Sequence, residues 1–181
     1  MEKNIYKDWH LYSLDEDYPH PGYTVKEIKK VMAQPDANTY QVTGDILHQG
    51  ALVNIEVFKN SEDFIEWYQN KNQEIQFVTL SAMIDTGAHK TSIDNKYIND
   101  LNLTKIDDVQ SIGFGGLVTS GKYPCVLYNS IFKYRALTLE ILNADLSHET
   151  YKAILGRDFL ENFTLIYDGW SNTFRLINVN V

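Results

Sequence analysis

Apolar and polar residues alternate along most of the chain after residue 40, and this two-residue period predicts strands. The clearest case is the stretch 51–58, where Val53, Ile55 and Val57 fall on one face. The pattern is typical of a mainly β protein. In chain order, the predicted strands cover residues 40–42, 51–58 and 77–84, a long hairpin over 109–130, a strand over 137–141, and a closing hairpin of 163–167 with 173–179.

Helical patterns are few and short. Thr24 with Glu27 three residues later forms a capping box, which predicts an amphipathic helix near the N-terminus. A second short helix is expected from Ser61, and a third over Asp158–Asn162. Between Lys90 and Asn102 the strand signal fades.

Residues 1–39 differ from the rest of the chain, being rich in Tyr, Trp, His and Pro. We expect an N-terminal extension with one amphipathic helix over 1–39, followed by a single domain over 40–181. The extension is expected to cover the surface of its own domain. The alternatives are an arm that binds a partner and an inhibitory segment that the protein itself removes.

The composition is that of an ordinary globular domain, since 44% of the 181 residues are hydrophobic and 22% are charged. No run reaches the ~20 apolar residues of a membrane span, so no membrane partner is expected. The first residues lack the apolar core of a signal peptide, which favours a cytoplasmic location. The single cysteine, Cys125, excludes an intramolecular disulfide and is expected to pack in a strand.

The charge pattern argues against two further classes of ligand. A formal net charge of -8 disfavours a phosphate-binding surface, and no cluster of Lys and Arg is interleaved with aromatic residues, so nucleic acid is not an expected partner. The five histidines are scattered, without the His or Cys spacing of a metal site. Neither a metal nor another cofactor is therefore expected.

The most informative segment is Met-Ile-Asp-Thr-Gly-Ala at residues 83–88. Asp85 stands where the predicted strand 77–84 gives way to a turn. Thr86 supplies a hydroxyl that can lock the loop, and Gly87 lets backbone approach without a side chain in the way. A carboxylate held in this manner is suited to activating water.

Two further segments follow in the chain. Ser111–Leu117 is a glycine-rich bend, and Ala153–Leu160 contains Ile-Leu-Gly-Arg-Asp. Together with Asp-Thr-Gly-Ala, these segments resemble the retropepsins, the single-domain aspartic proteases of retroviruses and their cellular and bacterial relatives. The resemblance implies an all-β closed barrel of the retropepsin type with a few short helices, in which residues 59–75 form a helical insertion and 109–123 a flap hairpin.

The chemistry of this family needs two carboxyl groups. One carboxylate takes a proton from water while a neighbouring carboxylic acid polarises the carbonyl of the peptide bond. Close carboxyls of this kind share one proton, for which the aspartic-protease dyad is the general example. The chain contains one Asp-Thr-Gly and no second. A second copy is therefore expected to complete the site, with catalytic residues Asp85, Thr86 and Gly87 from each member of a homodimer.

The resemblance assigns further roles by position. Thr86 would hydrogen-bond across the dimer axis, and Ile154, Leu155 and Gly156 would pack beneath the catalytic loop. For the glycine-rich bend, an ordinary hairpin without a binding role is the alternative. The residues implied to contact an extended peptide substrate are Ala88, His89, Gly113, Phe114, Gly115 and Gly116.

The chain departs from the retroviral pattern after Ala88. His89 and Lys90 stand where the resemblance implies acidic residues that bind the substrate backbone and pair with the arginine of the Gly-Arg motif. Arg157 is therefore expected to lose its partner, and Arg157 and Asp158 are expected to support the structure rather than react. If His89 lines the cleft, its protonation adds a pH dependence to substrate binding.

The sequence thus predicts an aspartic endopeptidase that cuts extended polypeptides with water activated by two copies of Asp85. Apolar side chains are the expected preference beside the cut bond. The alternative is a retropepsin-shaped module that binds or assembles extended peptides by strand addition and cuts nothing.

Overall fold

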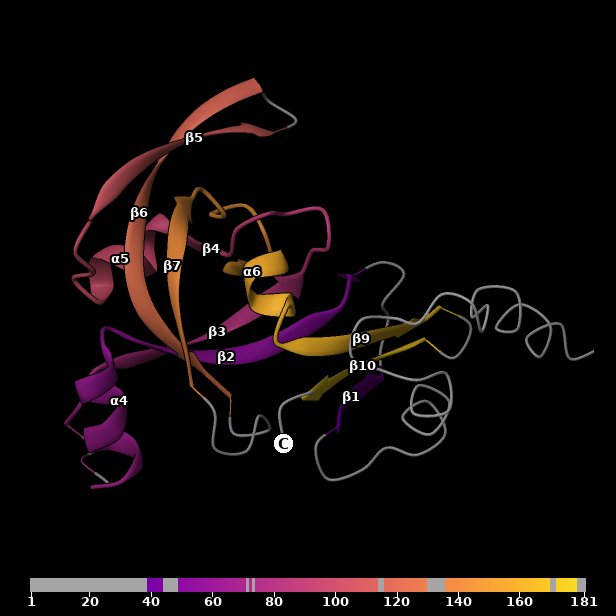
Figure 1. Cartoon of the computed structure of the whole chain (residues 1–181), viewed down its shortest axis with the longest axis horizontal. Coiled ribbons are helices and arrows are strands. Elements are labelled where there is room, and N and C mark those ends of the chain that lie inside the picture. Colours follow the sequence, from indigo (N-terminus) through magenta and orange to yellow (C-terminus); the bar gives the residue numbers. More distant parts are fainter. Residues whose placement is uncertain are drawn as a thin grey trace, which may run out of the picture. The chain divides into compact units, whose positions relative to one another are not determined.

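The computed structural model describes residues 39–43, 49–70, 72, 74–113, 116–129, 136–169 and 172–178, all within one compact unit, 38–181. The predicted helix after Thr24 and the rest of the predicted extension 1–39 lie outside the described residues, except for Thr39, which begins β1. The described helices are α4 (Ser61–Tyr68), α5 (Asn95–Asp100) and α6 (Arg157–Leu160) (Figure 1). The strands are β1 (Thr39–Thr43), β2 (Leu52–Phe58), β3 (Phe77–Ile84), β4 (Ser92–Asp94), β5 (Asp107–Gly113), β6 (Gly116–Tyr128), β7 (Leu137–Ala144), β8 (Ala153–Leu155), β9 (Phe163–Asp168) and β10 (Thr173–Asn178).

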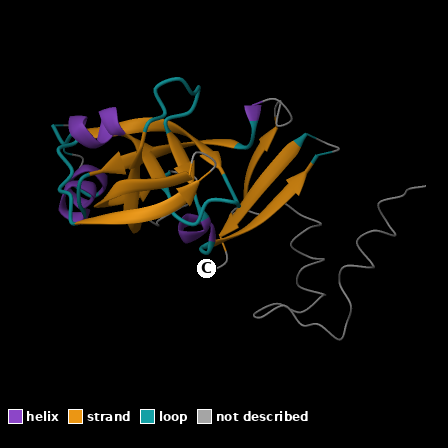
Figure 2. Cartoon of the chain, turned by 90° about the horizontal axis from the view of Figure 1, so that it is seen from above, coloured by secondary structure: helices purple, strands orange, loops and turns teal. Residues whose placement is uncertain are grey.

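The larger sheet closes on itself. Its strand order is β2-β3-β8-β4-β7-β6-β5, and β2 also pairs with β6, so that the strands from β2 to β6 form a ring while β5 extends from its side. The closing pairs are Glu56 with Tyr128, Val57 with Leu127 and Phe58 with Val126. Seen from above, strands dominate and helices lie at the margins (Figure 2). The prediction of an all-β chain with a closed sheet and a few short helices is confirmed.

The interior of this ring holds the main core. Val53, Ile55 and Val57 of β2 are at most 2% exposed, whereas Asn54 between them faces solvent. Leu155 of β8 and Phe159 of α6 are also fully buried. Because each buried aliphatic side chain contributes about 1.5–3 kcal/mol, this period-two pattern fixes the strand register.

A second apolar cluster lies on the outer face of the ring. Phe58 of β2 packs there against α4, with ring centroids 5.4 Å from Phe64 and 5.1 Å from Trp67. Asn60 caps this helix, because its side chain accepts a hydrogen bond from the backbone of Asp63 at 2.7 Å. The helix expected from Ser61 is therefore present, and it covers apolar side chains that the sheet leaves outside.

Glu56 lies beside this cluster, opposite Tyr128. Its Oε2 atom is buried and accepts no hydrogen bond from the described residues. Burial raises the pKa of the Glu56 carboxyl above its ordinary value. A raised pKa means that the folded chain holds this proton more tightly than the unfolded chain. The stability that protonation contributes is therefore complete below the ordinary pKa and lost as the pH rises through the raised value.

We expect Glu56→Gln to stabilise the protein at pH 7 and to have little effect near pH 4, since glutamine is neutral at both. Urea midpoints of both proteins at the two pH values measure this effect. Glu74→Gln, at an exposed position, is the matched control. Equal midpoints for Glu56→Gln and wild type at pH 7 would contradict the prediction.

A smaller antiparallel sheet has the order β1-β10-β9. The closing hairpin predicted from 163–167 and 173–179 is confirmed, with Thr173 opposite Asp168 and Asn178 opposite Phe163. Phe174 and Leu176 of β10 point into the main core. No helix among the described residues is long and apolar enough to cross a membrane.

The region 90–102, where the strand signal fades, contains both a strand and a helix. Asp94 joins them, because its buried carboxylate accepts a hydrogen bond from the backbone of Lys96 at 2.9 Å and caps α5. Its other oxygen accepts from the backbone of Leu146 at 2.9 Å. This aspartate is therefore structural, and it anchors the loop after β7.

Candidate active site

Asp85 follows the last residue of β3, and backbone hydrogen bonds to two other segments fix its position. The amide of Asp85 donates to the carbonyl of Leu155 at 3.1 Å, and the amide of Ile84 donates to the carbonyl of Ala51 at 2.9 Å. β3 also pairs in parallel with β8, with Ile84 opposite Leu155. The strand therefore delivers a half-buried carboxylate at a defined point of the sheet.

The loop after Asp85 turns back on its own side chain. The amide of Gly87 donates to Asp85 Oδ1 at 2.8 Å, and the amide of Ala88 donates to the carbonyl of Asp85 at 3.2 Å. A Cβ on Gly87 would lie 3.0 Å from Oδ1, tighter than ordinary contact. Asp85 Oδ2 accepts no hydrogen bond from any residue that the structure describes, so this oxygen is available to water or a second carboxyl.

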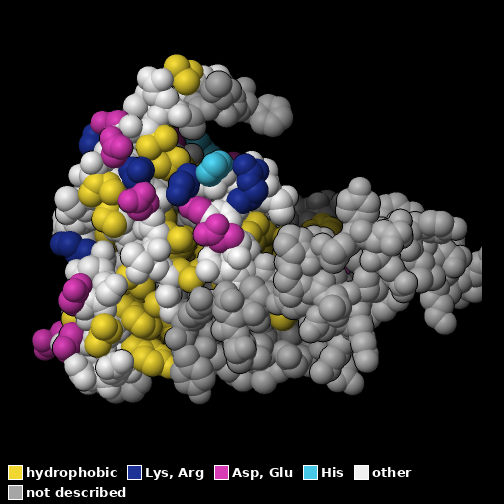
Figure 3. Space-filling model, viewed as in Figure 1, with side chains coloured by type: hydrophobic (Ala, Val, Ile, Leu, Met, Phe, Trp, Pro, Cys, Tyr) yellow, Lys and Arg dark blue, Asp and Glu magenta, His cyan; other side chains and the backbone are white. Residues whose placement is uncertain are grey.

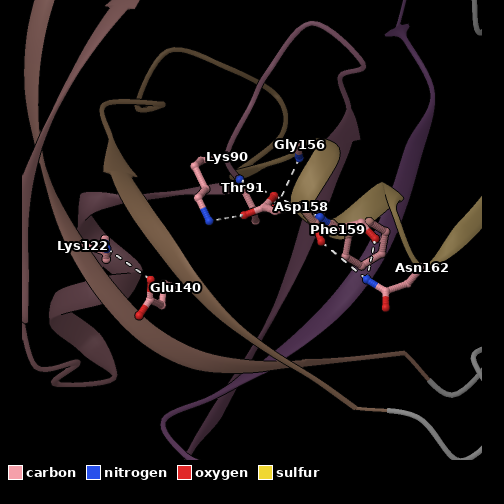
Figure 4. A network of polar contacts seen from close by, with 8 residues as sticks. All are labelled: Lys90, Thr91, Lys122, Glu140, Gly156, Asp158, Phe159 and Asn162. Carbon is pink, nitrogen blue, oxygen red and sulfur yellow. Dashed lines mark hydrogen bonds and ion pairs between the residues drawn. The ribbon is translucent and has the colours of Figure 1, made fainter.

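Behind the loop, Thr91 and Asp158 form a buried polar network (Figure 4). Asp158 Oδ1 accepts from the amide and the hydroxyl of Thr91, both at 2.8 Å, and from the amide of Phe159 at 2.9 Å. The Thr91 hydroxyl in turn accepts from the amide of Gly156 at 3.2 Å. These bonds join the end of the Asp85 loop to the start of α6.

Gly156 lies against the backbone of this loop. A Cβ at residue 156 would lie 2.6 Å from the carbonyl carbon of Lys90 and 2.9 Å from the amide nitrogen of Thr91. Both neighbours are backbone atoms, which cannot rotate away as a side chain can. The position therefore requires glycine for close approach.

Arg157 has partners that the sequence did not indicate. Its Nη1 donates to the carbonyl of Thr86 at 3.2 Å and to that of Gly87 at 3.3 Å, and its amide donates to the carbonyl of Ala88 at 3.0 Å. Arg157 was expected to lose the acidic partner of the retroviral pattern, and among the described residues it bonds to backbone carbonyls and forms no ion pair with a carboxylate. The negative charge of Asp158 is paired with Lys90, whose Nζ lies 3.6 Å from Asp158 Oδ2.

The glycine-rich bend joins β5 to β6, and Gly113 pairs with Gly116 across it. Phe114 and Gly115 lie outside the described residues. Gly116 has φ +101, a conformation that favours glycine. The hairpin projects from the ring in Figure 1, and Figure 3 shows a hollow between it and the body. Leu117 and Val118, 65% and 49% exposed, place apolar side chains on both faces of this hairpin.

Sequence reasoning missed Tyr151, a half-buried residue in the segment before β8. The pKa of its phenol is raised by burial first, and then by the carboxylates of Glu149 and Asp85. The phenol therefore lies close enough to Asp85 for their charges to interact. Among the described residues, no three His, Cys, Asp or Glu side chains converge as a metal site would require.

The predicted site residues thus fall into two groups. Asp85, Gly87, Ala88, Leu155, Gly156, Arg157 and Asp158 are joined by direct contacts around one loop. His89 is exposed at the end of this loop, and the side chain of Thr86 is also exposed, only its carbonyl being bound. Gly113 and Gly116 belong to the separate hairpin.

Comparison with known proteins gives matches among solved structures only. No family model matches the chain, and no curated protein does. The EIAV protease complexed with the inhibitor HBY-793 is 21% identical over 66% of this chain and 92% of its own, with a TM-score of 0.42. A retropepsin-like aspartic protease from Rickettsia conorii is 12% identical over 70% of this chain and 91% of its own, with a TM-score of 0.39. Retropepsin-like proteases, which the sequence motifs indicated, are thus among the structures that the chain resembles.

Proposed function

We propose that this protein is an aspartic endopeptidase of the retropepsin type, in which two copies of the chain each supply Asp85. The observation that carries the proposal is the Asp85 loop itself. One carboxylate oxygen is oriented by the Gly87 amide, the other is available, and the loop is held by β8 and α6. Such rigid support is what a group needs if it is to meet a reacting atom in a fixed geometry.

Hydrolysis would follow the chemistry of a carboxyl pair. The ionised Asp85 of one subunit takes a proton from water, and the protonated Asp85 of the other donates a hydrogen bond to the carbonyl oxygen of the peptide bond. The hydroxyl formed from water adds to the carbonyl carbon, and the proton then passes to the leaving nitrogen. No atom of the enzyme becomes covalently attached to the substrate.

The β5–β6 hairpin is the proposed cover of the substrate. Its exposed Leu117 and Val118 offer apolar contact, and its backbone offers hydrogen bonds to an extended peptide. The exposed hydroxyl of Thr86 is proposed to bond across the dimer axis. The substrate would lie between the hairpins and the two Asp85 loops.

Because one chain carries half of the carboxyl pair, we expect the activity per mole of chain to rise with protein concentration and then level off. A dilution series against a denatured protein substrate, compared with the mass measured by sedimentation or light scattering, tests this. The concentration for half-maximal activity should match that for half dimer. Activity from a species that sediments as a monomer would overturn the proposal.

A peptide analogue with a hydroxyl in place of the cut bond separates a protease from a binding module. A carboxyl pair built for the tetrahedral intermediate should bind this analogue at least about 100-fold more tightly than the plain amide. A module that captures peptides by strand addition has no such preference. Equal affinity for the two would favour the non-catalytic alternative.

A further inference from the structure

Three basic residues surround the Asp85 loop, although the chain as a whole carries a net charge of -8. His89 and Lys90 end the loop, and Arg157 begins α6. We call these three residues the basic rim. Figure 3 shows a histidine and dark blue Lys or Arg side chains, with acidic side chains beside them, on the body where it faces the projecting hairpin.

The Arg157 side chain lies along the carbonyl side of the loop. It is exposed, and Nη1 donates to the carbonyls of Thr86 and Gly87. No carboxylate of the described residues forms an ion pair with it. A guanidinium has five N–H donors, so most of them remain for a ligand, and its charge is not neutralised by the protein there.

Lys90 forms an ion pair with Asp158, whose carboxylate also accepts hydrogen bonds from other residues. Asp158 is only 11% exposed at its side chain and gives one oxygen to Thr91 and Phe159, whereas the Lys90 side chain is 38% exposed. The lysine side chain is therefore partly exposed at the end of the Asp85 loop. His89 stands exposed between Lys90 and the rest of the loop.

Two of the acidic side chains near the rim are partly compensated. Asp158 is paired with Lys90, and two Asp85 carboxyls that share one proton carry a single negative charge for two chains. A substrate carboxylate approaching Arg157 would thus meet a guanidinium that forms no ion pair with a carboxylate of the described residues. At a partly exposed site, a basic side chain adds only modest affinity for a substrate carboxylate. It discriminates more strongly against a substrate that places a positive charge there.

We propose that the basic rim binds a carboxylate side chain of the substrate, so that the enzyme selects peptides with Glu or Asp a few residues from the cut bond. The inference rests on the proposed function and names the class of substrate for the same site. It adds an acidic requirement to the apolar residues expected beside the bond itself.

The test begins with cuts mapped by mass spectrometry in a denatured protein. Peptides spanning the fastest site are then made with Glu or with Gln at each position within a few residues of the bond. At one such position we expect Glu to exceed Gln in kcat/KM by about threefold or more at low salt, and this ratio should fall toward one as salt is added. A ratio of one or less at every position overturns the inference.

The variant His89→Glu places a carboxylate at the exposed position directly before Lys90, and should bring the Glu to Gln ratio to one or below. Gln69→Glu makes the same change of charge at an exposed position at the end of α4, and should leave the ratio as in wild type. If the ratio in His89→Glu equals that of wild type, the basic rim is not the cause of the preference for Glu.

If no peptide is cut, the protease proposal fails. Whether the basic rim binds a carboxylate is then tested separately, by measuring peptide binding. Fluorescence anisotropy of the labelled Glu and Gln peptides with Asp85→Asn gives this measurement. Tighter binding of the Glu peptide by about threefold or more supports the rim as an acidic-peptide site, and equal binding overturns it.

Discussion

Replacing Asp85 by asparagine should abolish the cleavage of a denatured protein, with kcat/KM falling by about three orders of magnitude. Asparagine keeps an oxygen for the Gly87 amide, so the loop should keep its shape. The amide cannot take a proton from water or share one with a second carboxyl. Steady-state cleavage of one labelled peptide by both proteins gives the comparison.

The control for this variant is Glu161→Gln, which removes one negative charge at an exposed position just after α6 and should leave activity unchanged. Mixing provides a sharper test. When Asp85→Asn is added to wild type and subunits exchange, only pairs of two wild-type chains are active, so activity should follow the square of the wild-type fraction. A linear fall would mean that one chain holds a whole site.

Gly156→Ala should lower the free energy of unfolding by about 3 kcal/mol. The new Cβ would lie 2.6 Å from the carbonyl carbon of Lys90, and neither this atom nor the Thr91 amide can move without shifting the Asp85 loop. Urea unfolding followed by tryptophan fluorescence measures the change, and we expect activity to fall with it.

Gly169→Ala is the matched control for this substitution. A Cβ at residue 169 would meet only the ring of Tyr167 at 3.6 Å, an ordinary contact, and the residue is exposed. This variant should unfold close to the wild-type midpoint. If both alanine variants were equally stable, the close approach at Gly156 would not be a constraint on the fold.

Much of the β structure could be predicted because alternating burial leaves its period in the chain. Val53, Ile55 and Val57 fall inside the ring as their spacing predicts, and β3 ends at Ile84, directly before Asp85. The closing hairpin was found because turn residues separate two apolar runs. These are local signals, and each lies within one segment.

The elements missed between Lys90 and Asn102 are too short to show a period. β4 has three residues, and both its neighbours in the sheet, β7 and β8, lie far along the chain. The pairing of β1 with β10 is equally remote in sequence. Such contacts depend on packing rather than on any local pattern, so the sequence alone could not supply them.

The turn at Asp85 was predictable from the sequence, whereas the contacts that support this loop were much less so. The sequence indicated that Gly156 packs near the catalytic loop, but nothing in it indicated that Thr91 would be fully buried and bridge Gly156 to Asp158. Lys90 pairs with Asp158, and Arg157 bonds to backbone carbonyls. Both contacts depend on where the side chains lie in space, which the sequence does not show.

The loop that carries Asp85 is tied to residues about 70 positions later, since Thr91 bonds Asp158 and Arg157 bonds Thr86. A chain emerging from the ribosome therefore exposes Asp85 long before it has made the segment that shapes the loop. Contacts of such long range also make for slow folding. If the protein is the protease proposed above, an unfinished chain would carry the aspartate without the geometry of the site, and proteolysis would wait until synthesis has passed residue 158.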